Sequence, residues 1–326
     1  MEIGNPLNVI ISGKNDLGVE CSRILVDNPQ INILGIIGHS VDIPKDNWQK
    51  SLIKFALDRN IPVLKPKVIS LADIEKLCRG RKLDFLFSFQ YEKIIKRSVL
   101  NYPELGCINV HFSLLPRNRG VYTIAWTLLN GDEEAGVTIH YMDLGIDTGD
   151  IIGEKSFRIK DEYNAQDVYQ KCTSTGIELF AETLPKLITG KHVGEHQDKS
   201  KATYHSLSSI DFTDIQIDWT LSSVEVFNYI RAFIFPQFQC PTVSYGENEF
   251  HIFKVIIPSE KFENMTPGSF FLRSGHDQLY IATGDGFIVI EQFLEKGERF
   301  SPRELWQKYD LSHTGVFTVE HKNVEG

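Results

Sequence analysis

The sequence contains few cysteines, and their spacing suits neither a disulfide framework nor a zinc site. The five are Cys21, Cys78, Cys107, Cys172 and Cys240, and no two of them form a C-x-x-C pair. An odd number of widely separated cysteines is typical of reduced thiols in a cytosolic protein. We therefore expect a cytoplasmic protein with no disulfides and no bound metal.

The sequence also lacks long apolar runs. No run approaches the ~18 residues that a membrane-spanning helix requires. The first residues contain the acidic Glu2 and reach a strand-like segment before any basic residue appears, which is unlike a signal peptide. These features predict no association with a membrane.

Positive charge is not in excess. The formal net charge of the 326 residues is −9. Nucleic-acid binding draws on Lys and Arg to neutralise phosphates. The charge therefore argues against a nucleic-acid partner, although a local basic patch would be compatible with it.

The glycines near the N-terminus do not form a known nucleotide fingerprint. Gly13 and Gly18 are separated by four residues, which is not the G-x-G-x-x-G pattern of dinucleotide sites. No Lys-Ser or Lys-Thr follows them, as a P-loop would require. We interpret the segment as a strand, a turn and a helix, and we do not expect a nicotinamide cofactor.

Short apolar strands alternate with amphipathic helices through the first part of the chain. Alternation of this kind predicts an α/β fold, with a Rossmann-like, mostly parallel sheet covered by helices on both faces. The predicted strands are 8–12, 31–38, 62–64, 83–89, 107–110 and 137–141, and the predicted helices are 18–26, 46–60, 70–78, 94–100 and 161–187.

The pattern changes after a polar stretch at 190–206, which we interpret as a linker. A helix is predicted at 222–233, and the strand candidates after it are separated by Gly, Pro and Asn. These candidates are 242–245, 250–257, 268–272, 279–282 and 287–293. We therefore predict a catalytic domain over 1–205 and a smaller β-rich domain over 206–326.

Three polar residues lie where a catalytic site is expected. Asn109 and His111 close the apolar strand that begins at Cys107, and residues two apart on a strand face the same side. In a doubly wound sheet, ligands bind outside the carboxyl ends of the strands. Asp147 follows the next strand in a Gly-bounded loop, from which it can fold back towards the other two.

These residue types suit acyl transfer to an amine. An Asn amide and an imidazole N–H can stabilise a tetrahedral oxyanion, and a carboxylate can take the proton of the attacking amine. No nucleophilic Ser or Cys is required, and Cys107 fits a buried apolar strand. From the residues alone, a simpler interpretation stays open, in which Asn109 and His111 bond locally and Asp147 forms a turn.

The surrounding motif resembles the folate-dependent formyltransferases. That family carries Asn-x-His-x-Ser-Leu-Leu-Pro, an Arg-Gly, then Gly-Val-Thr-Ile and Asp-x-Gly. The corresponding residues here are Asn109, His111, Ser113-Leu114-Leu115-Pro116, Arg119-Gly120, Gly136-Val137-Thr138-Ile139 and Asp147-Thr148-Gly149. The resemblance implies that Asn109, His111 and Asp147 are catalytic and that N10-formyltetrahydrofolate is the donor. His140, which closes the Gly-Val-Thr-Ile segment, is either a supporting residue of the site or a structural histidine.

The resemblance also implies a slot for the donor and a second domain. The slot would be lined by Phe89, Gln90, Tyr91, Lys93, Ile95, Leu115, Asp143, Leu144, Gly145 and Ile146. Phe89 can equally be a core residue. Residues 217–233 and 279–290 resemble the OB-like C-terminal domain of two-domain members.

Within the family, the flanking segments resemble the sugar-nucleotide branch more than the methionyl-tRNA branch. Residues 86–95 are similar to the SF-aromatic segment of sugar enzymes. The loop at 38–50 lacks an Arg/Gly-rich insertion for gripping an acceptor stem, and the Trp-Arg-Gly-Ala-Ala-Pro segment of the tRNA enzyme is absent after His111. The resemblance implies a nucleotide-linked amino sugar as the acceptor, for example dTDP-4-amino-4,6-dideoxyglucose, and leaves open whether the nucleotide is dTDP, UDP or GDP. The product would be used in surface polysaccharides such as O-antigen.

The acceptor site would contain Ser113, Arg117, Asn118, Tyr122 and Trp126. Arg117 suits a nucleotide phosphate, because its guanidinium binds oxyanions bidentately. Tyr122 or Trp126 can stack on the base or sugar, although Trp126 can also pack a helix into the core. Residues 233–239 can border the sugar or form a homodimer surface. The alternatives are formylation of methionyl-tRNA and a non-catalytic protein that binds folate or a sugar nucleotide.

Overall fold

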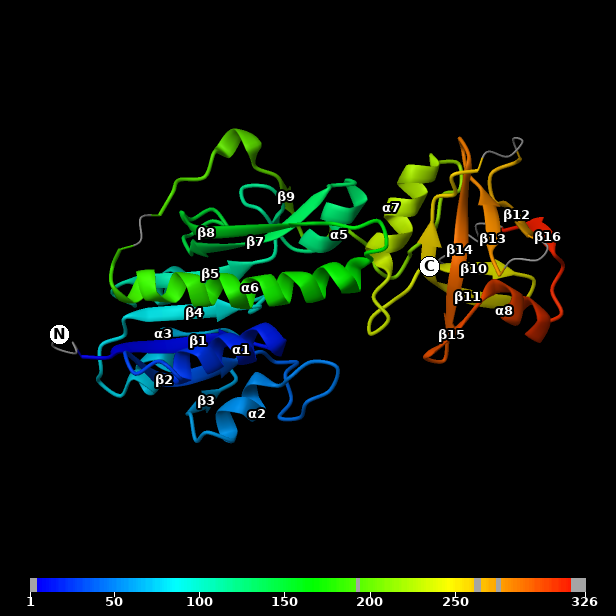
Figure 1. The fold of residues 1–326 in the computed structure, drawn as a ribbon. Helices are drawn as coiled ribbons and strands as arrows, with labels where there is room; N and C mark the ends of the chain where they lie inside the picture. Colours follow the sequence, from blue (N-terminus) through cyan, green and yellow to red (C-terminus); the bar gives the residue numbers. More distant parts are fainter. Residues whose placement is uncertain (1–4, 192–193, 261–264, 274–276, 318–326) are drawn as a thin grey trace, which may run out of the picture. The chain divides into compact units, whose positions relative to one another are not determined.

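The computed structural model describes residues 5–191, 194–260, 265–273 and 277–317. The chain forms two compact units (Figure 1). The first comprises Met1–Thr123, Glu134–Phe157 and Gln170–Ser206, and the second comprises Ile124–Glu133, Arg158–Tyr169 and Leu207–Gly326. Within the described ranges, no helix is long and apolar enough to cross a membrane. The division of the chain between residues 205 and 206 stays a prediction.

The first unit is built on a seven-stranded sheet. Its strand order is β3-β2-β1-β4-β5-β7-β8. The first five strands in this order pair in parallel, and β7 runs antiparallel to β5. The strands are β1 (Leu7–Gly13), β2 (Ile31–Gly38), β3 (Val63–Leu64), β4 (Phe85–Phe89), β5 (Gly106–His111), β7 (Glu134–Tyr141) and β8 (Ile151–Arg158). The predicted Rossmann-like, mostly parallel sheet is therefore confirmed.

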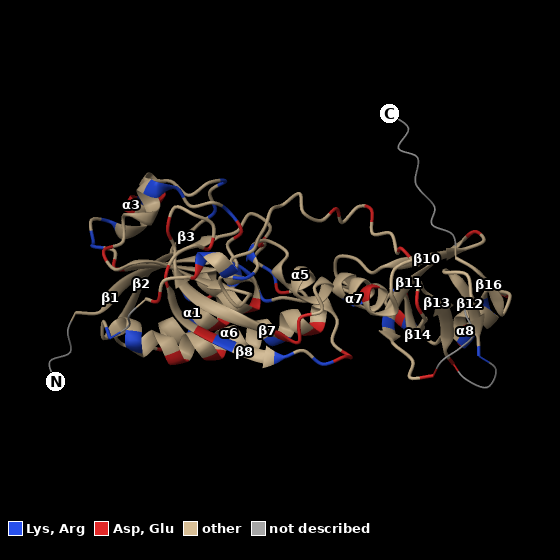
Figure 2. Cartoon of the chain, turned by 90° about the horizontal axis from the view of Figure 1, so that it is seen from above, with Lys and Arg blue, Asp and Glu red and all other residues tan. Residues whose placement is uncertain are grey.

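Helices cover both faces of this sheet, as the alternating side chains of β4 show. Phe87 and Phe89 point to one face, where their rings lie 5.4 and 5.1 Å from the ring of Phe180 in α6. Leu86 points to the other face and packs in one cluster with Leu77 of α3. The helices of the chain are α1 (Asn15–Val26), α2 (Leu52–Leu57), α3 (Leu71–Cys78), α4 (Arg97–Leu100), α5 (Thr123–Leu129), α6 (Ala165–Ile188), α7 (Ser223–Phe233) and α8 (Pro302–Lys308). Figure 2 shows acidic and basic residues mixed along α6, as expected for a helix with one solvent-facing side.

The strand order reverses between β1 and β4, and this reversal opens the carboxyl edge of the sheet to a ligand. At this edge the backbones of β1 and β4 approach closely, because a Cβ on Gly13 would lie 2.4 Å from the oxygen of Phe89. Strand β5 ends beside β4 at the same edge. Its last residues are therefore presented where ligands bind in folds of this type.

One predicted helix is much shorter than expected. The segment 46–60 is helical only over α2, and the side chain of Ser51 caps the helix by accepting a hydrogen bond from the backbone of Lys54. Asp46 accepts one from the backbone of Ser51. Asp side chains that bond to nearby backbone groups compete with helix formation. Trp48 therefore lies outside the helix and is 39% exposed, not on a buried helix face as predicted.

The second unit is β-rich, as predicted. Its antiparallel sheet has the order β10-β11-β14-β13-β12-β16, and β15 pairs with β14. Its core contains Phe270, Phe293 and Trp306, and the indole of Trp306 lies 5.8 and 5.9 Å from the two rings. The strands are β10 (Thr242–Tyr245), β11 (Asn248–Ile256), β12 (Ser269–Leu272), β13 (Leu279–Ala282), β14 (Phe287–Glu295), β15 (Glu298–Phe300) and β16 (Thr314–Val316).

Candidate functional site

Asn109 and His111 lie on β5 and face residues of the antiparallel strand β7. His140 lies opposite Asn109, and Thr138 lies opposite His111. The Asn109 Nδ2 atom is 3.3 Å from His140 Nε2. Thr138 donates to the carbonyl oxygen of Ser113, which fixes the start of the segment after β5. The register of β5 and β7 thus brings an amide and two imidazoles together.

Asp147 reaches this group from the loop after β7. Its backbone has a φ of 52°, in the left-handed region that non-glycine residues seldom adopt. Asp143 shapes the loop by accepting hydrogen bonds from Gly145 N (3.0 Å) and Thr148 Oγ1 (2.5 Å). Gly149 is required at the loop's end, because a Cβ there would lie 1.9 Å from the oxygen of Tyr141.

The carboxylate of Asp147 lies between the two histidines. Its Oδ2 is 3.6 Å from His111 Nδ1, and its Oδ1 is 3.4 Å from His140 Nε2. The backbone N–H of Gly120 donates to Oδ2 at 2.9 Å. The structure thus places Asn109, His111 and Asp147 in one cluster. His140 belongs to the same cluster, because it contacts both Asn109 and Asp147.

Backbone carbonyls orient both imidazoles. His111 Nε2 donates to the oxygen of Asn118 at 2.9 Å, and His140 Nδ1 donates to the oxygen of Tyr141 at 2.8 Å. A carbonyl oxygen can only accept, so these nitrogens carry hydrogens. The 3.6 Å from His111 Nδ1 to Asp147 exceeds ordinary hydrogen-bond length. Nδ1 is therefore the ring nitrogen of His111 that is left for a substrate, and it can donate a hydrogen bond when the ring is protonated.

Asp147 is held in its charged form. Burial by itself raises the pKa of this carboxyl, because the charged form loses solvation. The charge of His111, the hydrogen bond and charge of His140 and the N–H of Gly120 outweigh burial and bring the pKa well below its usual range. The cluster therefore contains a carboxylate that stays ionised throughout the neutral range.

No activated nucleophile accompanies this cluster among its described neighbours. Burial in β5 raises the pKa of the Cys107 thiol to about 12, so the thiol stays protonated. Ser113 donates its hydroxyl to the carbonyl oxygen of Arg117 at 2.8 Å. The arrangement is suited to direct acyl transfer, with two N–H donors and one carboxylate.

Most residues predicted for the donor slot lie at the carboxyl edge of the sheet in two groups. Phe89, Tyr91, Ile95 and Leu115 are buried, and the ring of Phe89 packs in the core. In contrast, Leu144 and Ile146 are 59% and 43% exposed on the Asp147 loop. Exposed apolar side chains beside a polar cluster are typical of a ligand-binding wall.

The polar residues of the predicted slot have partners within the protein. Gln90 accepts a hydrogen bond from Asn15 Nδ2 at 3.2 Å and has a φ of 56°. Lys93 donates to the oxygen of Pro66 at 3.5 Å. Tyr91 is different, because its buried hydroxyl makes no hydrogen bond with any residue that the structure describes.

The residues predicted for the acceptor are more dispersed. Arg117 is exposed, whereas Ser113 and Asn118 are buried. Tyr122 is half-buried with a φ of 57°. Trp126 belongs to the second unit, where its indole N–H donates to Ser209 Oγ at 3.2 Å.

The segment that we interpreted as a linker contains residues of the site that sequence reasoning missed. Gln197 donates to the oxygens of Asp147 and Gly149. The backbone of Asn118 donates to Thr203 Oγ1 at 2.7 Å, and the Asn118 side chain contacts His205 Nε2 at 3.1 Å. Strand β9 (Tyr204–His205) pairs in parallel with β6 (Arg119–Gly120). The polar composition of 190–206, without apolar periodicity, gave no signal for these contacts.

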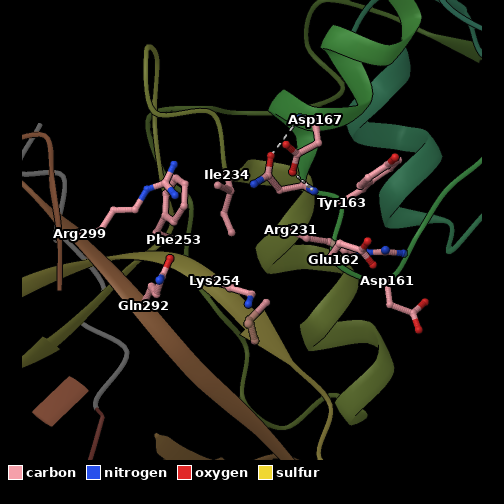
Figure 3. Close-up of a pocket in the computed structure, with 12 residues that line it drawn as sticks. Asp161, Glu162, Tyr163, Asp167, Arg231, Ile234, Phe253, Lys254, Gln292 and Arg299 are labelled. Atoms are coloured by element: carbon pink, nitrogen blue, oxygen red, sulfur yellow. Dashed lines mark hydrogen bonds between the residues drawn. The ribbon is translucent and has the colours of Figure 1, made fainter. Parts of the chain in front are cut away.

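A cavity of about 440 Å³ lies in the second unit and contains none of the predicted site residues. Figure 3 shows its walls, where Asp167 accepts a hydrogen bond from the backbone of Asn164. The lining contains three acidic and three basic side chains, which are Asp161, Glu162, Asp167, Arg231, Lys254 and Arg299. Equal numbers of acidic and basic side chains do not indicate a ligand of either charge. The candidate active site is defined by the convergence of side chains in the first unit.

Comparison with known proteins gives two family matches. The model of the formyl transferase family matches residues 26–184. That of the formyl transferase C-terminal domain matches residues 209–310. A methionyl-tRNA formyltransferase from Geobacter sulfurreducens is 31% identical over 300 residues, which cover 91% of this chain and 92% of the relative.

Two solved formyltransferase structures are also similar to this chain, and their descriptions name a sugar where the relative above names methionyl-tRNA. WlaRD, a sugar 3N-formyl transferase solved in the presence of dTDP and 5-N-formyl-THF, is 31% identical with a TM-score of 0.76, covering 90% of this chain and 100% of its own. An N-formyltransferase from Helicobacter canadensis, solved with folinic acid and dTDP-3-aminofucose, is 30% identical with a TM-score of 0.73, covering 88% and 100%. On these matches, and with the clustered Asn109, His111 and Asp147, the chain belongs to the formyl transferase family.

Proposed function

We propose that the protein transfers the formyl group of N10-formyltetrahydrofolate to the amine of a nucleotide-linked amino sugar. The observation that carries the formyl-transfer chemistry is the meeting of Asn109, His111 and His140 around the ionised carboxylate of Asp147. A buried carboxylate with two imidazoles and an amide, and no activated nucleophile, fits direct attack of an amine on a formyl carbon.

In this proposal Asn109 Nδ2 and His111 Nδ1 donate hydrogen bonds to the oxyanion that develops on the formyl oxygen. His111 does so as an imidazolium, because its Nε2 already donates to the oxygen of Asn118. A bond forms between the amine nitrogen and the formyl carbon, and the bond from that carbon to N10 breaks. The proton lost by the amine moves to N10 through Asp147 or through one water. Asp147 also stabilises the positive charge that gathers on the attacking nitrogen, since its carboxyl stays ionised.

The donor slot is proposed at the carboxyl edge of the sheet, beside the cluster. Leu144 and Ile146 present exposed apolar surface on the Asp147 loop. A flat heterocycle with polar edges matches such a slot, because apolar walls hold its faces and hydroxyl or backbone groups bind its edges. The folate ligands named for WlaRD and the Helicobacter canadensis enzyme support this proposal.

Two observations support an amino sugar as the acceptor. The two sugar N-formyltransferases above align with nearly nine-tenths of this chain at 30–31% identity. The segment after His111 carries Arg117 and Tyr122, which suit a nucleotide phosphate and a ring. The other candidate acceptor is methionyl-tRNA, and it is favoured by curated relatives of similar identity. The non-catalytic alternative has no use for an ionised Asp147.

The catalytic roles predict a loss of rate without a loss of binding. Replacing Asn109 or His111 with Ala should lower kcat on the order of 10²–10³-fold, because each change removes one donor to the oxyanion. Steady-state kinetics with purified variants measures this, and the exposed Asn101→Ala is the matched control. A near wild-type kcat in either variant would contradict the assigned role.

A panel of acceptors tests the substrate. Purified protein would receive N10-formyltetrahydrofolate together with dTDP-, UDP- or GDP-linked amino sugars, or with methionine-charged initiator tRNA. We expect formylation of one sugar nucleotide, detected by mass spectrometry, and no formylation of the tRNA. Formylation of the tRNA alone would overturn the sugar proposal, and turnover of no amine would support the non-catalytic alternative.

The low pKa of Asp147 predicts a pH-dependent stability. Folding lowers this pKa, so the ionised carboxylate stabilises the folded state above about pH 4, the pKa of an unfolded Asp. That contribution is lost as the pH falls towards the folded-state pKa. Relative to Asp147→Asn, the wild-type free energy of unfolding should decline as the pH falls below about 5. Urea unfolding at several pH values measures the difference, and a difference independent of pH would refute the ionised state.

A further inference from the structure

The side chain of Gln197 joins two loops of the candidate site. Its Nε2 donates to the oxygens of Asp147 (2.9 Å) and Gly149 (2.7 Å). Its Oε1 accepts from Arg119 Nε (3.1 Å) and Nη2 (2.7 Å). Both N–H groups and the oxygen of one amide are therefore used in fixed directions.

One of the two segments that Gln197 joins contacts the carboxylate of Asp147, and the other is the Asp147 loop itself. The loop with Arg119 and Gly120 provides the N–H that binds Asp147 Oδ2. This loop is itself anchored on the chain after Gln197, because β6 pairs with β9 and a Cβ on Gly120 would lie 2.1 Å from the oxygen of His205. Gln197 and β9 thus hold the Gly120 side of the carboxylate in place.

Asp147 needs support of this kind. Its left-handed φ of 52° is an unfavourable conformation for a residue with a Cβ, and such conformations persist only where neighbours over-determine them. The Gln197 amide binds the carbonyl of Asp147 itself and that of Gly149, two residues on. It therefore acts on the backbone whose conformation aims the carboxylate at His111 and His140.

We propose that Gln197 is a positioning residue for formyl transfer, which sets the Asp147 loop so that the carboxylate meets both imidazoles. This inference rests on the proposed function. This role requires an amide, because only a side chain with both a donor and an acceptor can bind two carbonyls and a guanidinium at the same time. A carboxylate in its place would keep the acceptor for Arg119 and lose both donors.

The test compares Gln197→Glu and Gln197→Met with the wild type. The Glu variant keeps the contact to Arg119 and loses the bonds to Asp147 and Gly149, whereas the Met variant loses both sets at similar volume. Both should lower kcat about 10–10²-fold, since a misplacement near 1 Å at a catalytic group can cost on the order of 10²-fold. KM for both substrates should stay within about threefold, because Gln197 makes no proposed substrate contact.

Asp198→Ala is the matched control. Asp198 is the next residue in the chain, and within the described ranges its side chain binds nearby Ser200 and Lys201. It should keep the wild-type kcat. A wild-type kcat in Gln197→Met would overturn the inference. A wild-type kcat in Gln197→Glu, together with a loss in Gln197→Met, would also overturn it, because the residue would then act through Arg119 alone.

A second measurement separates this inference from the proposed function. Amide hydrogen exchange of residues 142–150, followed by mass spectrometry without substrates, should be faster in both Gln197 variants and unchanged in Asp198→Ala. Exchange that is unchanged in both Gln197 variants would overturn the positioning role whatever the acceptor. Absence of formyl transfer by the wild-type protein, with faster exchange in the variants, would overturn the proposed function and leave the loop contact established.

Discussion

The geometry of the candidate site depends on how the first unit accommodates one buried charge, the carboxylate of Asp147. The carboxylate of Asp147 has lost much of its solvent, and such a charge persists only with partners that replace water. His111, His140 and the N–H of Gly120 provide them. Each partner is fixed by a different element, since His111 comes from β5, His140 from β7 and Gly120 from β6. The pairing of β5 with β7 and of β6 with β9 therefore sets the geometry of the site.

Four residues around the candidate site have a left-handed backbone. Gln90, Asn118, Tyr122 and Asp147 all have φ between 52° and 57°, and each lies in a loop after a strand of the first unit or on the segment after β5. Left-handed residues of this kind gather at functional sites, where surrounding contacts hold them. Here those contacts include the chain at 197–205, which binds the backbone around both Asn118 and Asp147.

Much of the fold could be predicted from the sequence, because the periodicity of apolar residues indicates which segments form strands and which form helices. The buried run of β4 and the cap at Ser70 before α3 are local signals. The length of α2 was not predictable in this way. Asp46 and Ser51 form side-chain hydrogen bonds to the backbone that set where the helix begins, and a pattern of apolar residues does not reveal such bonds. The cluster of Asn109, His111 and Asp147 was predictable from strand ends and from the resemblance. Gln197 was not, because its contacts join positions about 50 and 78 residues apart and leave no local pattern.

In the proposed mechanism, Asn109 and His111 bind the formyl oxygen while Asp147 lies beside the attacking amine. A crystal structure with the stable donor analogue 10-formyl-5,8-dideazafolate measures this most directly. We expect a formyl oxygen about 2.7–3.1 Å from both Asn109 Nδ2 and His111 Nδ1, with the open face of the formyl carbon towards Asp147. A formyl group bound away from these three side chains would contradict it.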